Sequence, residues 1–180
     1  CCKTADLMAT RNDREQAMVS YRRAEKFARE AVEALGNNTE ARRDLSIVCG
    51  FIGIYLADGG EIDSGLAMYG QGMKIAGEMA SEDPQNTLPQ ADLAAGHFEI
   101  GTILMKGQRY EAAEVRFHEA FDRFSRLVAA DSADVDSRIS MARSARRAGD
   151  ACTALAENKQ NGGGQSQWRS RAMVWFGKSL

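Results

Sequence analysis

One motif recurs along this chain at a fixed interval, and it limits the fold more than any other feature does. In each copy a glycine follows an isoleucine, a second glycine comes six residues later, and an aromatic residue comes ten residues after that. These residues are Ile52, Gly53, Gly59 and Tyr69 in one copy and Ile100, Gly101, Gly107 and Phe117 in the next. A further step of the same length, from Gly101, reaches Gly149. Self-similarity at such a period is typical of an α-solenoid, whose units bury their apolar faces against their neighbours.

Between the turn residues, apolar residues recur three and four positions apart, which predicts amphipathic helices. The segment 14–35 shows this spacing in Ala17, Tyr21 and Ala24, and Thr39 is expected to cap the next helix. The predicted helices span residues 14–35, 39–58, 62–81, 88–106, 110–130, 135–157 and 168–180. We therefore predict an all-α fold of about seven helices, arranged as antiparallel pairs in a right-handed superhelix.

The turns divide the sequence into repeats of a single predicted domain, residues 1–180. The repeats are a partial one at 1–38, then 39–86, 87–134 and 135–180, the last with an inserted loop at 158–167. That loop contains the glycine run 162–164. The first nine residues read as the tail of a helix, and the last predicted helix is still running at Leu180. Both ends therefore look cut from a longer protein.

Charge and hydropathy exclude several classes of function. The net charge is −2 and the pI about 5.8, so the chain as a whole has no electrostatic footprint for nucleic acid. No apolar run approaches the roughly 18 to 20 residues that span a bilayer, so we predict no direct membrane insertion. Cys49 and Cys152 are predicted as small buried side chains on helices. The Cys1-Cys2 pair would also suit a lipidated N-terminal cysteine.

Groups that could carry chemistry are few. His97 is expected on an apolar helix face, whereas His118 is expected to be solvated. Glu111 and Glu114 have helical spacing and are predicted on an outer, solvated face. The glycine run 162–164 lacks the lysine and hydroxyl residue of a phosphate-binding loop. We therefore predict no catalytic residue, no cofactor and no metal site.

Arginine is concentrated on one predicted helix near the end of the chain. By the repeat register, Arg143 and Arg146 face the inner curve, in line with Phe98, Thr102 and Met105 of the preceding repeat. We predict that these five residues form a surface for a peptide with an acidic terminus. The alternative interpretation is a solvated basic helix that contacts a neighbouring repeat.

The pattern of small and large positions resembles the tetratricopeptide repeat. That family has a Leu-Gly pair on the first helix of each repeat and small, aromatic and small residues on the second. The matching residues here are Ile52, Gly53, Gly65, Tyr69 and Gly72 in one repeat and Ile100, Gly101, Ala113, Phe117 and Ala120 in the next. The resemblance implies that the aromatic residues fill the space between helices and that the small residues let the helices touch. The chain departs from the family in its repeat length and in the late position of Pro84.

This longer repeat is similar to the C-terminal repeats of large bacterial serine/threonine protein kinases. The similarity rests on the segments 42–45, 83–86, 91–93 and 171–180. It implies a non-enzymatic region that regulates or scaffolds a larger signalling protein, and the chain contains none of the kinase motifs. The resemblance also implies a protein or peptide partner. The expected location is the cytoplasm or the outer side of a membrane-anchored bacterial protein. The alternative is a structural segment of a stand-alone repeat protein or lipoprotein, which would self-associate through its repeat ends.

Overall fold

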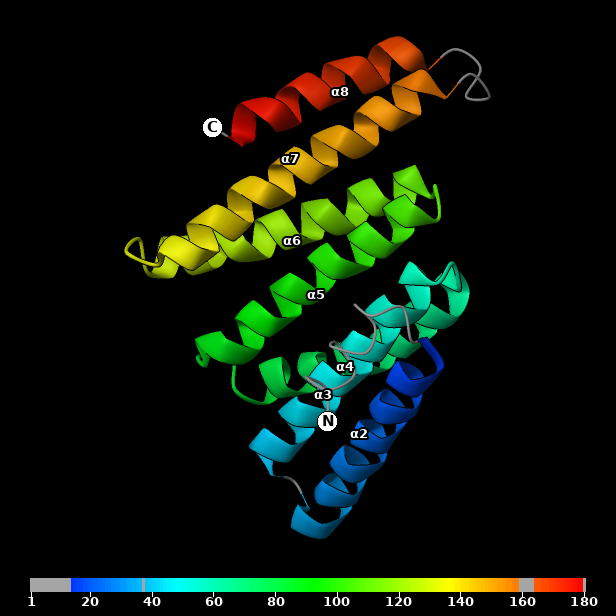
Figure 1. Cartoon of the computed structure of the whole chain (residues 1–180). Helices are drawn as coiled ribbons and strands as arrows, with labels where there is room; N and C mark the ends of the chain where they lie inside the picture. The colour runs from blue at the N-terminus through cyan, green and yellow to red at the C-terminus, as the bar shows by residue number, and fades with distance from the viewer. Residues whose placement is uncertain (1–13, 37, 159–163, 180) are drawn as a thin grey trace. The chain divides into compact units, whose positions relative to one another are not determined.

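The computed structural model of the chain (Figure 1) describes residues 14–36, 38–158 and 164–179. Over these ranges it contains seven helices and no strand, so the predicted all-α class is confirmed. The helices are α2 (Arg14–Leu35), α3 (Thr39–Asp58), α4 (Ile62–Glu82), α5 (Thr87–Lys106), α6 (Tyr110–Ala130), α7 (Val135–Glu157) and α8 (Gln165–Lys178). The predicted helix tail at 1–9 and the Cys1-Cys2 pair lie outside the described residues.

The chain divides into two compact units, with the boundary between Asp83 and Pro84. Unit 1 contains α2, α3 and α4, and unit 2 contains α5 to α8. Within each unit, consecutive helices pack against each other and run in opposite directions (Figure 1), and in unit 2 α5 also contacts α7. The antiparallel helix pairs are therefore present inside each unit. One continuous domain and a superhelical path for the whole chain stay predictions.

Three helices begin with the same kind of side-chain cap, placed one repeat length apart. Asn38, Asn86 and Asp134 precede α3, α5 and α7, and the side-chain oxygen of each accepts a hydrogen bond from a backbone amide of the first turn. The donors are Ala41 (2.9 Å), Leu88 (3.1 Å) and Ser137 (2.9 Å). The prediction that Thr39 caps its helix was wrong, because Thr39 is already the first residue of α3.

The recurring glycines lie where another helix comes close, but the close approach of a helix backbone that their pattern predicts is found only at the first of them. A Cβ atom on Gly53 would stand 2.8 Å from the backbone nitrogen of Tyr69 on α4, so the backbones of α3 and α4 are in close contact at this position. On Gly101 it would stand 2.7 Å from the ring of Phe117, and on Gly149 2.5 Å from the ring of Phe176. At these two positions the close neighbour is therefore an aromatic ring rather than a backbone.

The cores of the two units are built from the inward faces of these helices. In unit 1, Tyr21, Leu45, Ile52 and Met68 pack in one cluster with Cys49. In unit 2, Phe117 is fully buried, and the small residues Ala113 and Ala120 lie one turn to either side of it on α6. Cys49 and Cys152 are both buried and free, which confirms their predicted role.

Two further predictions were wrong, one about the start of α8 and one about a glutamate that α8 covers. Helix α8 begins at Gln165, so the last three residues of the predicted 158–167 loop are helical, and glutamine is a good helix former. Residues 159–163 of that loop lie outside the described part of the chain. Glu114 is buried rather than solvated, because Arg171 and Trp175 of α8 both donate hydrogen bonds to its carboxylate.

Candidate functional site

A cleft of about 430 Å³ lies between α5 and α7 in unit 2. Its lining residues are Phe98, Glu99 and Thr102 from α5 and Arg143, Arg146, Arg147 and Asp150 from α7. Four of the five residues predicted to bind a partner thus line one cleft. The fifth, Met105, is partly buried and is not among the residues that line it.

The repeat register explains why these residues meet. Helices α5 and α7 occupy equivalent places in successive repeats and contact each other. Arg146 and Arg147 lie one repeat length after Phe98 and Glu99, so residues of the same register face the same cleft. The repeat register predicted Arg143 and Arg146 on the inner face but did not predict Arg147, which is adjacent to Arg146 and also lines the cleft.

The Phe98 ring and the arginines of α7 form one wall of the cleft, and the buried Phe117 ring lies behind them. The Phe98 ring meets the buried Phe117 ring edge-on, with 5.4 Å between their centroids. The Arg143 guanidinium lies over Phe98 at 5.2 Å, and that of Arg147 lies over Phe117 at 5.4 Å. Cation–π contacts of this kind stabilise an arginine over a ring by about 0.5–1 kcal/mol at exposed sites. The wall therefore presents positive charge beside aromatic rings.

The charges in the cleft are only partly balanced within the protein. Arg147 lies 3.5 Å from Asp150, which neutralises it in part. Arg143 and Arg146 have no carboxylate partner among the residues that the structure describes, although Glu99 stands in the same cleft. Thr102 donates its hydroxyl hydrogen to the carbonyl oxygen of Phe98 at 3.1 Å, so it offers a ligand an acceptor and a methyl group. Arg143 and Arg146 are therefore the groups that remain to attract an anion.

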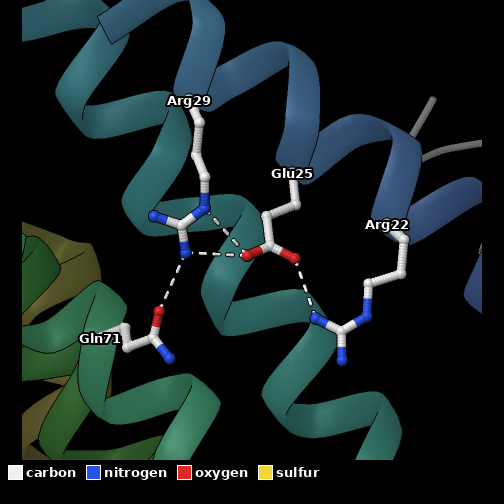
Figure 2. A network of polar contacts seen from close by, with 4 residues as sticks. All are labelled: Arg22, Glu25, Arg29 and Gln71. Atoms are coloured by element: carbon white, nitrogen blue, oxygen red, sulfur yellow. Dashed lines mark hydrogen bonds and ion pairs between the residues drawn. The ribbon is translucent and has the colours of Figure 1, made fainter. Parts of the chain in front are cut away.

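Unit 1 shows the opposite arrangement, in which arginines are paired internally (Figure 2). Arg22 and Arg29 of α2 both bind the carboxylate of Glu25, at 2.9 and 2.8 Å, and Arg29 also donates to Gln71 of α4 at 3.0 Å. Burial raises the pKa of Glu25, but the hydrogen bonds from Arg29 and Arg22 outweigh it, and the net pKa is lowered. These arginines stabilise the packing of α2, and the carboxylate of Glu25 balances part of their charge.

A smaller pocket of about 100 Å³ adjoins the cleft. It shares Phe98, Glu99 and Arg143 with the cleft and adds Ala95, Phe124 and Ser140. Its extra walls are mainly apolar, so it could accept an aliphatic side chain next to a bound anion.

His97 lies on the side of α5 that packs against α6 and is buried, as predicted. Its Nδ1 is 2.8 Å from a carboxylate oxygen of Glu119, but the bond direction is poor and the nitrogen lacks a good hydrogen bond. Burial lowers the pKa of His97, and Arg123 and Arg116 lower it further, whereas Glu119 raises it. Within the described ranges, no three His, Cys, Asp or Glu side chains are placed to hold a metal ion.

Searches for relatives give no assignment. No protein-family model and no curated protein matches this chain. Among the described helices, none is both long and apolar enough to cross a membrane.

Proposed function

We propose that this chain is a protein-binding module and that the cleft between α5 and α7 binds an acidic peptide segment. The observation that carries the proposal is the pair Arg143 and Arg146, which line a cleft without a carboxylate partner among the described residues. Guanidinium groups bind carboxylates through paired, charge-assisted hydrogen bonds. An acidic residue of the partner would meet these arginines, and a neighbouring apolar residue would enter the smaller pocket.

The repeat resemblance supports a wider proposal about the parent protein. A repeat region that presents such a cleft suits a regulatory or scaffolding part of a larger bacterial signalling protein, such as a serine/threonine kinase. Binding a partner segment would also stabilise the helices that form the cleft, by mass action. No cofactor takes part in this function.

The test is a selection of random eight-residue peptides against the protein. We expect the selected peptides to be enriched in Asp and Glu. The double variant Arg143→Glu/Arg146→Glu should bind them at least about tenfold more weakly, since it removes two charge-assisted contacts and adds repulsion. Arg138→Glu is the matched control, because this exposed arginine is on the same helix and outside the cleft. Peptides without acidic residues, or equal binding by the double variant, would refute the proposal.

Self-association is a second candidate function, favoured by exposed apolar side chains on α8. Met173 and Val174 are 76% and 60% exposed. A second copy of the chain that docks on this face would bury both residues. Light scattering with size exclusion should then show dimers that become monomers in the Met173→Ser/Val174→Ser variant. A monomer at all concentrations would exclude this candidate.

A further inference from the structure

A second pocket of unit 2, of about 290 Å³, lies where the start of α5 meets the end of α6. Arg123 and Arg126 of α6 contribute positive charge to it, and Gln85 and Gln90 contribute amides. No carboxylate is among its described lining residues, and neither arginine has an ion-pair partner in the described part of the chain. The pocket is separate from the cleft between α5 and α7, and no residue lines both.

The equivalent place in unit 1 is closed by an internal ion pair. Arg42 of α3 is buried and lies 2.6 Å from Glu82 and 3.6 Å from Glu78 on α4. These contacts join the two helices of the pair at the same position in the repeat. The charge of a buried arginine is thus balanced within unit 1.

A shift by one repeat length changes every member of that ion pair. Arg42 becomes Gln90, Glu82 becomes Ala130, and Glu78 becomes Arg126. The cation on the first helix is lost, and one of the two anions on the second helix is replaced by a cation. Unit 2 thus has a pocket with two unpaired arginines where unit 1 has a closed contact. The positive charge of this pocket is therefore open to an anion from outside the chain.

We propose that this pocket binds a phosphate monoester. The group carries a charge of about −1.5 to −2 at neutral pH, which balances both arginines, whereas one carboxylate would balance only one. The planar guanidinium groups of Arg123 and Arg126 match the oxygen geometry of a phosphate. Pro84 and Leu127 form an apolar part of the wall, against which the carbon part of the ester lies. The proposal does not rest on the proposed peptide-binding function.

The test is calorimetric titration at pH 7.5 with three probes: inorganic phosphate, O-phosphoserine and a short phosphoserine peptide. We expect saturable one-site binding, at least tenfold weaker in the Arg123→Gln/Arg126→Gln variant. The Arg138→Gln/Arg169→Gln variant is the matched control, because both arginines are exposed and lie outside the pocket and the cleft, and it should bind the probes like the wild-type chain. The source of the phosphate follows from the probes: tighter binding of the peptide indicates a phosphorylated protein, and equal or tighter binding of O-phosphoserine indicates a small metabolite.

A second variant restores two of the three charges of unit 1 in this pocket and leaves Ala130 at the position of Glu82. Gln90→Arg with Arg126→Glu places a cation and an anion at the positions of Arg42 and Glu78. This variant should fold, because it copies a contact that the chain already contains, and it should lose phosphate binding. The proposal is overturned if the wild-type chain binds none of the three probes, or if either pocket variant binds them as the wild type does.

Discussion

Arg171 of α8 binds the buried carboxylate of Glu114 on α6 through two parallel hydrogen bonds. Nε lies 3.0 Å from Oε1, and Nη2 lies 2.9 Å from Oε2. Trp175 donates a third bond from its indole nitrogen to Oε1 at 2.8 Å. Ala172 and Trp175 are the only residues of α8 that are buried among its described residues. The contact with Glu114 therefore joins α8 to α6, in addition to the packing of α8 against α7.

Replacing Arg171 by alanine should destabilise the protein by about 2–4 kcal/mol, because it leaves the Glu114 charge buried with only one hydrogen-bond donor. Urea unfolding followed by tryptophan fluorescence measures the change. Arg169→Ala is the matched control on an exposed side of α8 and should change stability by less than about 0.5 kcal/mol. Equal stabilities of the two variants would contradict the structural role of this ion pair.

Adding a methyl group to three glycines should have three different effects. Gly101→Ala should cost about 1–3 kcal/mol, because the fully buried Phe117 ring has nowhere to move. Gly149→Ala should cost less, because the Phe176 ring is 37% exposed and can shift. Gly70→Ala should stabilise α4 by up to about 1 kcal/mol, since nothing lies within 4 Å of the added carbon. Thermal unfolding of the three variants should give this order, and any stabilisation by Gly101→Ala would refute it.

Acid should weaken the fold through His97. In the unfolded chain this side chain titrates near pH 6.5, and in the folded protein its pKa is lower, chiefly because of burial. Below pH 6.5 the unfolded state therefore binds the proton more readily, and the free energy of unfolding falls as the pH decreases toward the folded pKa. Unfolding in urea between pH 7.5 and 5.5 measures this slope.

Two variants distinguish the contribution of His97 to the pH dependence of stability from the contributions of other titrating groups. His97→Gln should flatten the slope, because the glutamine binds no proton in this range. Glu119→Gln should steepen it, since Glu119 is the group that raises the pKa of His97. A slope that is the same in wild type and His97→Gln would show that another group controls the acid sensitivity.

The buried thiols should react only when the fold opens. Burial raises the pKa of Cys49, and burial with the nearby Glu114 charge raises that of Cys152 to about 11. Since the thiolate is the reactive form, both should be inert toward a disulfide reagent at pH 8. The Cys1→Ser/Cys2→Ser variant leaves only these two thiols to be counted. Rapid reaction of these thiols with the reagent in the folded protein, before urea is added, would contradict this prediction.

Much of the helical framework could be predicted, because its signals are local or repeat at a fixed distance. Gly149 lies one repeat length after Gly101, and Phe176 aligns with Phe117 once the insertion that breaks the period is allowed for. The structure places each of these rings against the corresponding glycine. The position of Glu114 could not be predicted in this way. Its spacing is that of a solvated glutamate, and its partner Arg171 is 57 residues away, beyond an insertion that breaks the period.

Part of the candidate cleft could also be predicted, because the repeat register determines which residues lie on the same face. Arg143, Arg146, Phe98 and Thr102 were placed by the register, which is a property of the sequence. The pairing of Arg147 with Asp150 is local, since Asp150 follows three residues later on the same helix. The contact of Arg143 with Phe98 depends on how α7 packs against α5, so the sequence alone could not show it.

The caps at Asn38, Asn86 and Asp134 have a consequence for how such a chain can change in length. A segment that begins just after one cap residue and ends with the next cap residue contains one helix pair. It includes a cap residue, the glycine at the helix contact and the aromatic ring that packs on that glycine. Tandem duplication of residues 87–134 would therefore insert a helix pair that needs no new local signal. Gene duplication could in this way lengthen the chain by whole helix pairs, while single substitutions, such as the one that distinguishes Arg126 from Glu78, change the charge at equivalent positions of the copies.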